Sequence, residues 1–151
     1  MSEQELFNGL IATYRDLNTR VRLLPEQRLR LGHPGDTVRG VILDMRDEEL
    51  RFSQALKDRI SGLSIDDVFG GKGKTTGLDI PSPDDTTNEV ISQFGTARES
   101  TLAMLRGLAP EAWDDQDAAA VTIRDATDGL LVSDGKHMER IVRLLGSPSA
   151  N

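Results

Sequence analysis

Cysteine is absent from this chain of 151 residues, and aromatic side chains are scarce, with one tryptophan and one tyrosine. Without cysteine the chain has no disulfide bonds, no cysteine-ligated zinc site and no thiolate nucleophile of its own. No segment approaches the ~20 consecutive apolar residues that a membrane-spanning helix needs. The first residues are acidic where a secretory signal is basic, which predicts a soluble cytoplasmic protein.

Basic residues are outnumbered by acidic ones, 18 to 25, so the formal net charge is −7. Acidic pairs occur at Asp66–Asp67, Asp84–Asp85 and Asp114–Asp115. Such a chain repels the phosphates of nucleic acids, and its few aromatic residues offer no platform on which single strands stack. The arginines between residues 20 and 30 are the exception, and we interpret them as a solvated helix end. We therefore expect no nucleic-acid partner.

Three helix starts are marked by a serine or threonine followed three residues later by an acid. In this pattern the side chains and the backbone satisfy each other's hydrogen bonds. The pattern occurs at Ser2, Thr86 and Thr122, each before apolar residues at helical spacing. A fourth apolar run begins after Asp36, its expected cap, and stops near residue 61. No segment alternates like a strand, so the predicted class is all-α, with four helices of about 20 residues.

A long glycine-containing segment, residues 61–85, separates the second and third predicted helices. Its Gly-Lys-Thr sequence resembles the end of a phosphate-binding loop, but the leading glycine of that motif would fall on Val68 and no strand precedes it. We therefore expect a flexible loop. A helical hairpin needs only about 2–8 connecting residues, so this connection is long enough to let the second and third helices run parallel. We predict one domain, residues 1–151, folded as a four-helix bundle with a long crossover between helices two and three.

A polar trio interrupts the apolar stripe of the last predicted helix: Ser133, Asp134 and His137. An unpaired polar group in an apolar setting costs about 1–3 kcal/mol. The trio therefore either lines a wet pocket or satisfies its own hydrogen bonds. In the second case Asp134 would pair with His137, and the hydroxyl of Ser133 would bond to the carbonyl at 129.

Three segments resemble the DinB/YfiT-like family of four-helix bundles. Residues 34–45 are similar to the start of that family's second helix, residues 108–113 to its link between the third and fourth helices, and residues 122–141 to its last helix. The resemblance implies the crossover bundle and a homodimer. For relatives of the thiol-dependent maleylpyruvate isomerases it also implies a divalent metal that activates a small thiol such as mycothiol or bacillithiol.

In that family three histidines, one on the second helix and two on the last, hold the metal at one end of the bundle. Position by position, the resemblance places Asp44, Ser133 and His137 there, with Asp134 as the nearest replacement for the serine. The expected metal ligands are therefore Asp44, Asp134 and His137, with Ser133 and Glu48 lining the pocket. Such a mixed set binds Zn²⁺ or Ni²⁺ weakly and shifts the preference toward harder ions such as Mn²⁺.

Two functions remain open after the sequence analysis. In the first, the bundle has a degraded metal site and serves as a small-ligand-binding or dimeric interaction protein. In the second, it is a transferase or isomerase that depends on a divalent metal and a low-molecular-weight thiol. The weakened ligand set favours the first. Neither function identifies a catalytic residue; the first requires no cofactor, whereas the second requires the divalent metal (Zn²⁺, Ni²⁺ or Mn²⁺) and the thiol. Trp113 is expected to close one end of the bundle.

Overall fold

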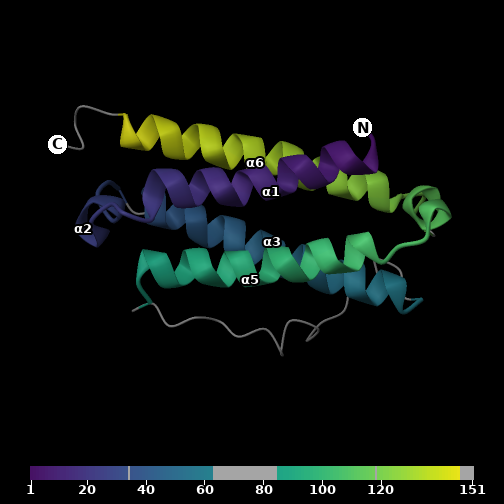
Figure 1. The fold of residues 1–151 in the computed structure, drawn as a ribbon. Helices are drawn as coiled ribbons and strands as arrows, with labels where there is room; N and C mark the ends of the chain where they lie inside the picture. The colour runs from purple at the N-terminus through teal and green to yellow at the C-terminus, as the bar shows by residue number, and fades with distance from the viewer. Residues whose placement is uncertain (34, 63–84, 118, 147–151) are drawn as a thin grey trace.

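The computed structural model describes residues 1–33, 35–62, 85–117 and 119–146. The described residues form four long helices, a one-turn helix and a 3-10 helix (Figure 1): α1 (Glu3–Val21), α2 (Glu26–Leu29), α3 (Val38–Ile60), α5 (Thr87–Arg106), η1 (Pro110–Asp114) and α6 (Ile123–Leu145). None of them lies in a strand, so the predicted all-α class is confirmed. The loop predicted at 61–85 lies almost entirely outside the described residues. In the described part, no helix combines the length and the apolar character that crossing a membrane requires.

Side-chain caps fix the start of each long helix. Ser2, Thr86 and Thr122 each accept a hydrogen bond from the backbone N–H three residues later, as predicted. The expected cap of α3 was wrong, because Thr37 rather than Asp36 accepts the N–H of the third residue of that helix. The carboxylate of Asp36 instead accepts a hydrogen bond from the guanidinium of Arg140 on α6, at 2.8 Å.

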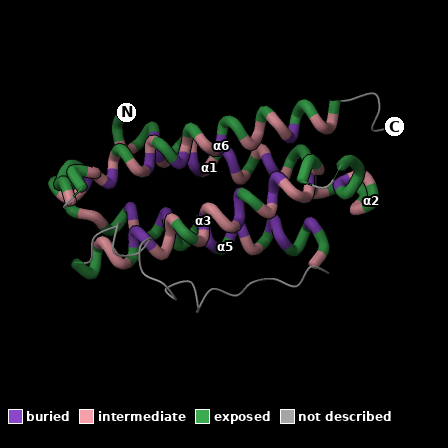
Figure 2. The backbone as a smooth tube through the Cα atoms, turned by 180° about the vertical axis from the view of Figure 1, so that it is seen from behind, coloured by how far each residue is buried: buried purple, intermediate pink, exposed green. Residues whose placement is uncertain are grey.

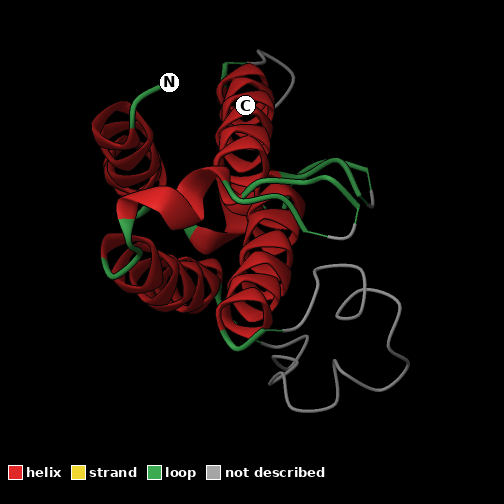
Figure 3. Ribbon diagram, turned by 90° about the vertical axis from the view of Figure 1, so that its right-hand side faces the viewer, coloured by secondary structure: helices red, strands yellow, loops and turns green. Residues whose placement is uncertain are grey.

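The four long helices pack side by side in a ring, in which α1 contacts α6, α6 contacts α3, α3 contacts α5 and α5 contacts α1. The view along the helices shows this arrangement (Figure 3). Two contacts give the direction of α5 relative to α3. Arg46 donates to Gln93 at 3.0 Å, and two turns further on the hydroxyl of Ser53 meets that of Ser100 at 3.5 Å. Because the residue numbers rise together along both helices, α3 and α5 run parallel.

The core consists of two apolar clusters, one at each end of the helices. Figure 2 shows the buried residues along the inward-facing sides of the helices. The cluster at the α2 end includes Leu17, Val21, Leu29, Val41, Ile42, Met45, Val90, Phe94 and Ile141, and the cluster at the η1 end includes Leu6, Leu10, Leu56, Leu102, Leu105, Trp113, Ile123 and Leu130. Between them, buried polar side chains from α3, α5 and α6 lie in the middle of the fold.

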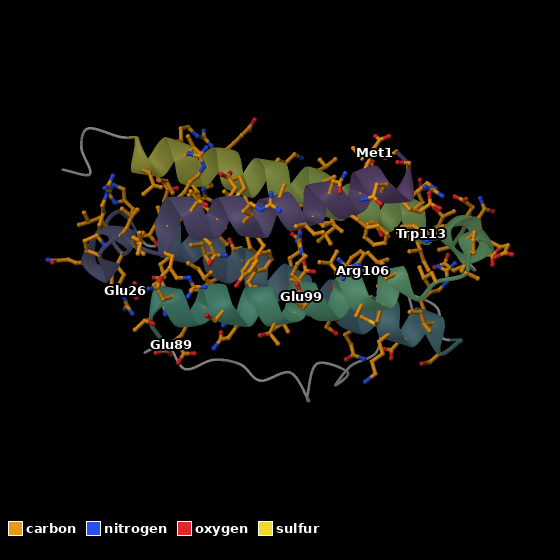
Figure 4. The ribbon with its side chains drawn as sticks, viewed as in Figure 1. Met1, Glu26, Glu89, Glu99, Arg106 and Trp113 are labelled. Carbon is orange, nitrogen blue, oxygen red and sulfur yellow. The ribbon has the colours of Figure 1, made fainter. Side chains whose placement is uncertain are left out.

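Trp113 closes the η1 end, as the sequence predicted. Its side chain is buried, and its ring meets that of Phe7 edge to face with 5.9 Å between the centroids. Figure 4 places Trp113 at the opposite end of the molecule from Glu26 on α2. The guanidinium of Arg124 lies 5.6 Å from the tryptophan ring, which adds a cation–π contact to this end.

The arginines near α2 connect helix ends. Arg28 donates to the carbonyl of Leu145 at the end of α6, at 3.0 Å. Arg30 donates to the carbonyl of Asp85, which precedes α5, at 3.3 Å. The interpretation of this basic patch as a solvated helix end was therefore incomplete, because its guanidinium groups also satisfy carbonyls of neighbouring segments.

Candidate functional site

The polar trio of α6 divides between two partners on other helices. Ser133 and His137 lie half-buried where α6 meets α3, and both approach Glu48. The hydroxyl of Ser133 donates to Glu48 Oε2 at 3.0 Å, and His137 Nε2 lies 3.6 Å from the same oxygen. We call Glu48, Ser133 and His137 the seam site. Two predicted pocket-lining residues and one predicted ligand are thus brought together.

Asp44 lies beside the seam site but is exposed. It precedes Glu48 by one helical turn, and His137 follows Ser133 by one turn. Ser133 bonds to Glu48 and Arg140 bonds to Asp36, so α3 and α6 run in opposite directions. Asp44 therefore lies at about the level of His137 along the seam. His137 Nε2 is buried and has no hydrogen-bond partner.

Asp134 points away from the seam and into the core, where it pairs with Arg98 of α5. Both Asp134 oxygens accept hydrogen bonds from this guanidinium, at 2.8 and 2.9 Å. Arg98 also donates to Glu49 Oε1 of α3 at 2.7 Å and to the carbonyl of Leu10 of α1 at 3.0 Å. All four long helices therefore meet at one side chain. We call Glu49, Arg98 and Asp134 the polar layer.

The polar layer is almost completely removed from solvent, with Glu49 0%, Arg98 2% and Asp134 3% exposed. Burial opposes the charge of Arg98, but Asp134 and Glu49 outweigh it and raise the pKa of the guanidinium above its usual value. Burial raises the pKa of the Glu49 carboxyl, although Arg98 acts in the opposite direction. Glu49 Oε2 is buried and has no hydrogen-bond partner.

This geometry bears directly on the expected metal ligands Asp44, Asp134 and His137. Asp134 has both oxygens engaged by Arg98, so neither is free to ligate an ion at the seam. Within the described ranges, no group of three or more histidine and carboxylate side chains is placed to hold a metal ion. The donors in this part of the chain therefore do not fit a three-ligand metal site. The alternative pairing of Asp134 with His137 is also absent, because Asp134 pairs with Arg98 of α5, whereas Ser133 and His137 both approach Glu48 of α3.

Glu49 and Arg98 were not predicted as site residues, although the sequence contains a signal for both. Glu49 lies four residues after the buried Met45, and Arg98 lies four residues after the buried Phe94, so each continues an apolar stripe. Asp134 occupies the same kind of position on α6. One basic and two acidic residues at stripe positions of three helices would have suggested a buried ion cluster.

Neither a family model nor a curated protein nor a solved structure matches the chain. The seam site places a carboxylate, a hydroxyl and an imidazole half-buried between α3 and α6, whereas the polar layer pairs one guanidinium with two carboxyl groups in the core.

Proposed function

We propose that the chain is a DinB-like four-helix bundle with a crossover between α3 and α5, and that its metal site is degraded. In this proposal the seam site serves in small-ligand binding or in a dimeric interaction, without strong metal binding. The parallel direction of α3 and α5 supports the topology. The meeting of α3 and α6 side chains at Glu48 supports the location of the site.

The observation that carries the proposal is the engagement of Asp134 by Arg98 inside the core. Catalytic zinc sites use three protein ligands, and structural zinc sites use four. With Asp134 excluded from the candidate ligands, His137 is the one imidazole at the seam. Ser133 occupies the position where the resemblance implies a second histidine. Such a set binds a divalent ion weakly at most. Compared with an all-histidine site, its preference is shifted from Zn²⁺ or Ni²⁺ toward harder ions such as Mn²⁺.

The alternative function is a transferase or isomerase that depends on a divalent metal and a small thiol. One observation favours it, namely that His137 Nε2 is buried without a hydrogen-bond partner. A bound metal would lower the pKa of an external thiol. Asp44 and His137 are the residues that would face such an ion from α3 and α6.

Restoring the missing imidazole tests the proposal. The substitution Ser133→His, alone or with Asp44→His, is expected to raise the affinity for Zn²⁺ at least tenfold, about 1.4 kcal/mol, in titration calorimetry. Histidines four residues apart on one helix then face the same ion. Adding His137→Ala is expected to abolish the gain.

Lys136→His is the matched control, because it adds an imidazole at an exposed position of α6 beside the seam. It is expected to leave the affinity unchanged. No gain in the double variant, with the helix content intact, would mean that these residues do not converge. Tight Zn²⁺ binding by the unsubstituted protein would favour the enzymatic alternative instead.

Self-association is the second part of the proposal. Val132 and Val142 on α6 are 51% and 43% exposed, and they leave apolar surface for a second copy. Light scattering is expected to give a mass of about twice that of the chain, as for a twofold dimer. A mass that stays at 16.5 kDa at all concentrations would contradict the dimer.

A further inference from the structure

The polar layer buries more negative than positive charge. It holds two carboxyl groups and one guanidinium, and all three residues are at most 3% exposed. An uncompensated charge in the interior is strongly unfavourable, so buried groups neutralise themselves where they can. Neutralising this layer requires one additional positive charge.

The two carboxyl groups differ in their ability to accept that charge. Asp134 uses both oxygens as acceptors for the guanidinium of Arg98, so a proton there would remove an acceptor from a two-pronged ion pair. Glu49 uses only Oε1, and its Oε2 is buried without a partner. A proton on Glu49 Oε2 breaks none of these hydrogen bonds.

We propose that the polar layer is a buried binding site for one proton, held on Glu49 Oε2, and that this proton makes the stability of the fold sensitive to pH. The groups that face Glu49 come from the three other long helices. Arg98 and the hydroxyl of Thr101 face it from α5, Asp134 faces it from α6, and the carbonyl of Leu10 on α1 shares the guanidinium. The Thr101 hydroxyl already donates to the Ala97 carbonyl at 3.2 Å.

The direction of the pH dependence follows from the raised pKa of Glu49. Its ordinary value is 4.5, and burial raises it in the folded protein, so the folded state retains a proton that the unfolded state has lost. Stability therefore falls as the pH rises from 4.5 through the folded pKa, and it changes no further from this group above that point. Paired surface carboxylates such as Glu3 and Asp114 have lowered pKa values and contribute the opposite trend at acid pH.

The polar layer adjoins the seam site. Glu49 follows Glu48 directly on α3, and Asp134 follows Ser133 directly on α6, while Glu48 and Ser133 bond to each other at the seam. This inference does not depend on the proposed metal-poor function, because it concerns the core side of the same two helices.

The test compares Glu49→Gln with Asp134→Asn in the full chain, using urea unfolding over a range of pH. Glutamine has the shape and charge of the protonated acid, so the stability of Glu49→Gln should not depend on this proton. We therefore compare the folding equilibrium constant of Glu49→Gln with that of the unsubstituted protein. Their ratio is expected to rise about tenfold or more from acid to alkaline pH. Asp134→Asn breaks the two-pronged pair and is expected to reduce the folding constant at every pH. A ratio that stays constant with pH overturns the proposal, as does an equal loss in both variants.

A second measurement reports the proton directly and does not depend on the stability of a variant. Infrared spectra of the folded protein just above pH 4.5, the ordinary pKa of a glutamate, are expected to contain a carboxylic-acid carbonyl band that is missing in Glu49→Gln. A spectrum with no difference between the two proteins overturns the proposal. A folding constant that rises specifically with Na⁺ or K⁺ over choline, at equal ionic strength, would assign the neutralising charge to a metal cation and overturn it too.

Discussion

Arg98 and Asp134 form a bidentate salt bridge across the centre of the fold, with nitrogen–oxygen distances of 2.8 and 2.9 Å. In the ring of four helices, α5 and α6 stand diagonally opposite, so this pair spans the core rather than joining neighbours. The planar guanidinium suits such a contact, because it donates two parallel hydrogen bonds to one carboxylate. The phenyl ring of Phe94 lies 4.9 Å from the same guanidinium.

Removing the guanidinium is expected to destabilise the fold strongly. Arg98→Met leaves Glu49 and Asp134 buried without a cation, and the expected loss is about 3–5 kcal/mol in urea unfolding. Arg98→Lys keeps the charge, but its ammonium group cannot donate the two parallel hydrogen bonds of the guanidinium. We therefore expect this variant to be less stable than the unsubstituted protein, although by less than Arg98→Met. Equal stabilities of the Met variant and the unsubstituted protein would contradict this role.

Replacing the whole polar layer is expected to have the opposite effect. The triple variant Glu49→Leu, Arg98→Met, Asp134→Leu removes both acids together with the base, so no uncompensated charge remains. Buried ion triads replaced in this way are often neutral or more stable by about 1–4 kcal/mol. The same unfolding experiment measures it, and a loss equal to that of the single Arg98→Met variant would contradict the explanation by unpaired charge.

The caps and the polar layer show which features the sequence could predict. The caps at Ser2, Thr86 and Thr122 were predictable because each hydrogen bond joins residues three apart. The partner of Asp134 was not, because Arg98 lies 36 positions away on a helix whose register the sequence pattern does not specify. The error at Asp36 has the same origin, since Arg140 on a distant helix binds its carboxylate and leaves the cap to Thr37.

The parallel direction of α3 and α5 predicts where an engineered disulfide will form. The chain has no cysteine, and the hydroxyl oxygens of Ser53 and Ser100 are 3.5 Å apart. The double variant Ser53→Cys, Ser100→Cys is therefore expected to cross-link within one molecule under mild oxidation, as a shift in non-reducing electrophoresis shows. In the control pair Ser53→Cys, Ser92→Cys, the second cysteine lies about 12 Å from the position of Ser100, toward the start of α5, so no cross-link is expected. A cross-link in the control alone would contradict the observed register.

The turn before α6 holds a residue with a left-handed backbone. Ala120 has φ 62°, and Asp117 Oδ1 accepts the neighbouring N–H groups of Ala119 and Val121 at 2.8 and 3.0 Å. This conformation costs a residue with a Cβ about 1–2 kcal/mol, whereas glycine loses about 0.5–1 kcal/mol through its freedom in the unfolded state. Ala120→Gly is therefore expected to stabilise the protein by about 0.5–1 kcal/mol in urea unfolding. Ala119→Gly, at a position outside the left-handed region, is expected to give no gain, and a loss at Ala120 would contradict the argument.

Gly95 on α5 is expected to resist replacement by alanine, because its missing side chain makes room for Tyr14 of α1. A Cβ at this position would lie 2.5 Å from Cζ and 2.7 Å from Cε1 of the tyrosine ring. In an unobstructed helix the change from glycine to alanine stabilises by about 0.5–1 kcal/mol, but overpacking of a core costs about 1–3 kcal/mol. The clash is the larger effect, so Gly95→Ala should lower the free energy of unfolding.

Two further variants separate the clash from helix propensity. Gly129 on α6 is exposed, and a Cβ added there would meet nothing within 4 Å, so Gly129→Ala should raise stability by about 0.5–1 kcal/mol. Combining Gly95→Ala with Tyr14→Ala removes the obstructing ring, and the double variant should be more stable than the sum of the two single changes predicts. That coupling is the expected sign of direct contact between these residues, and strict additivity in urea unfolding would mean that α1 and α5 do not pack closely here.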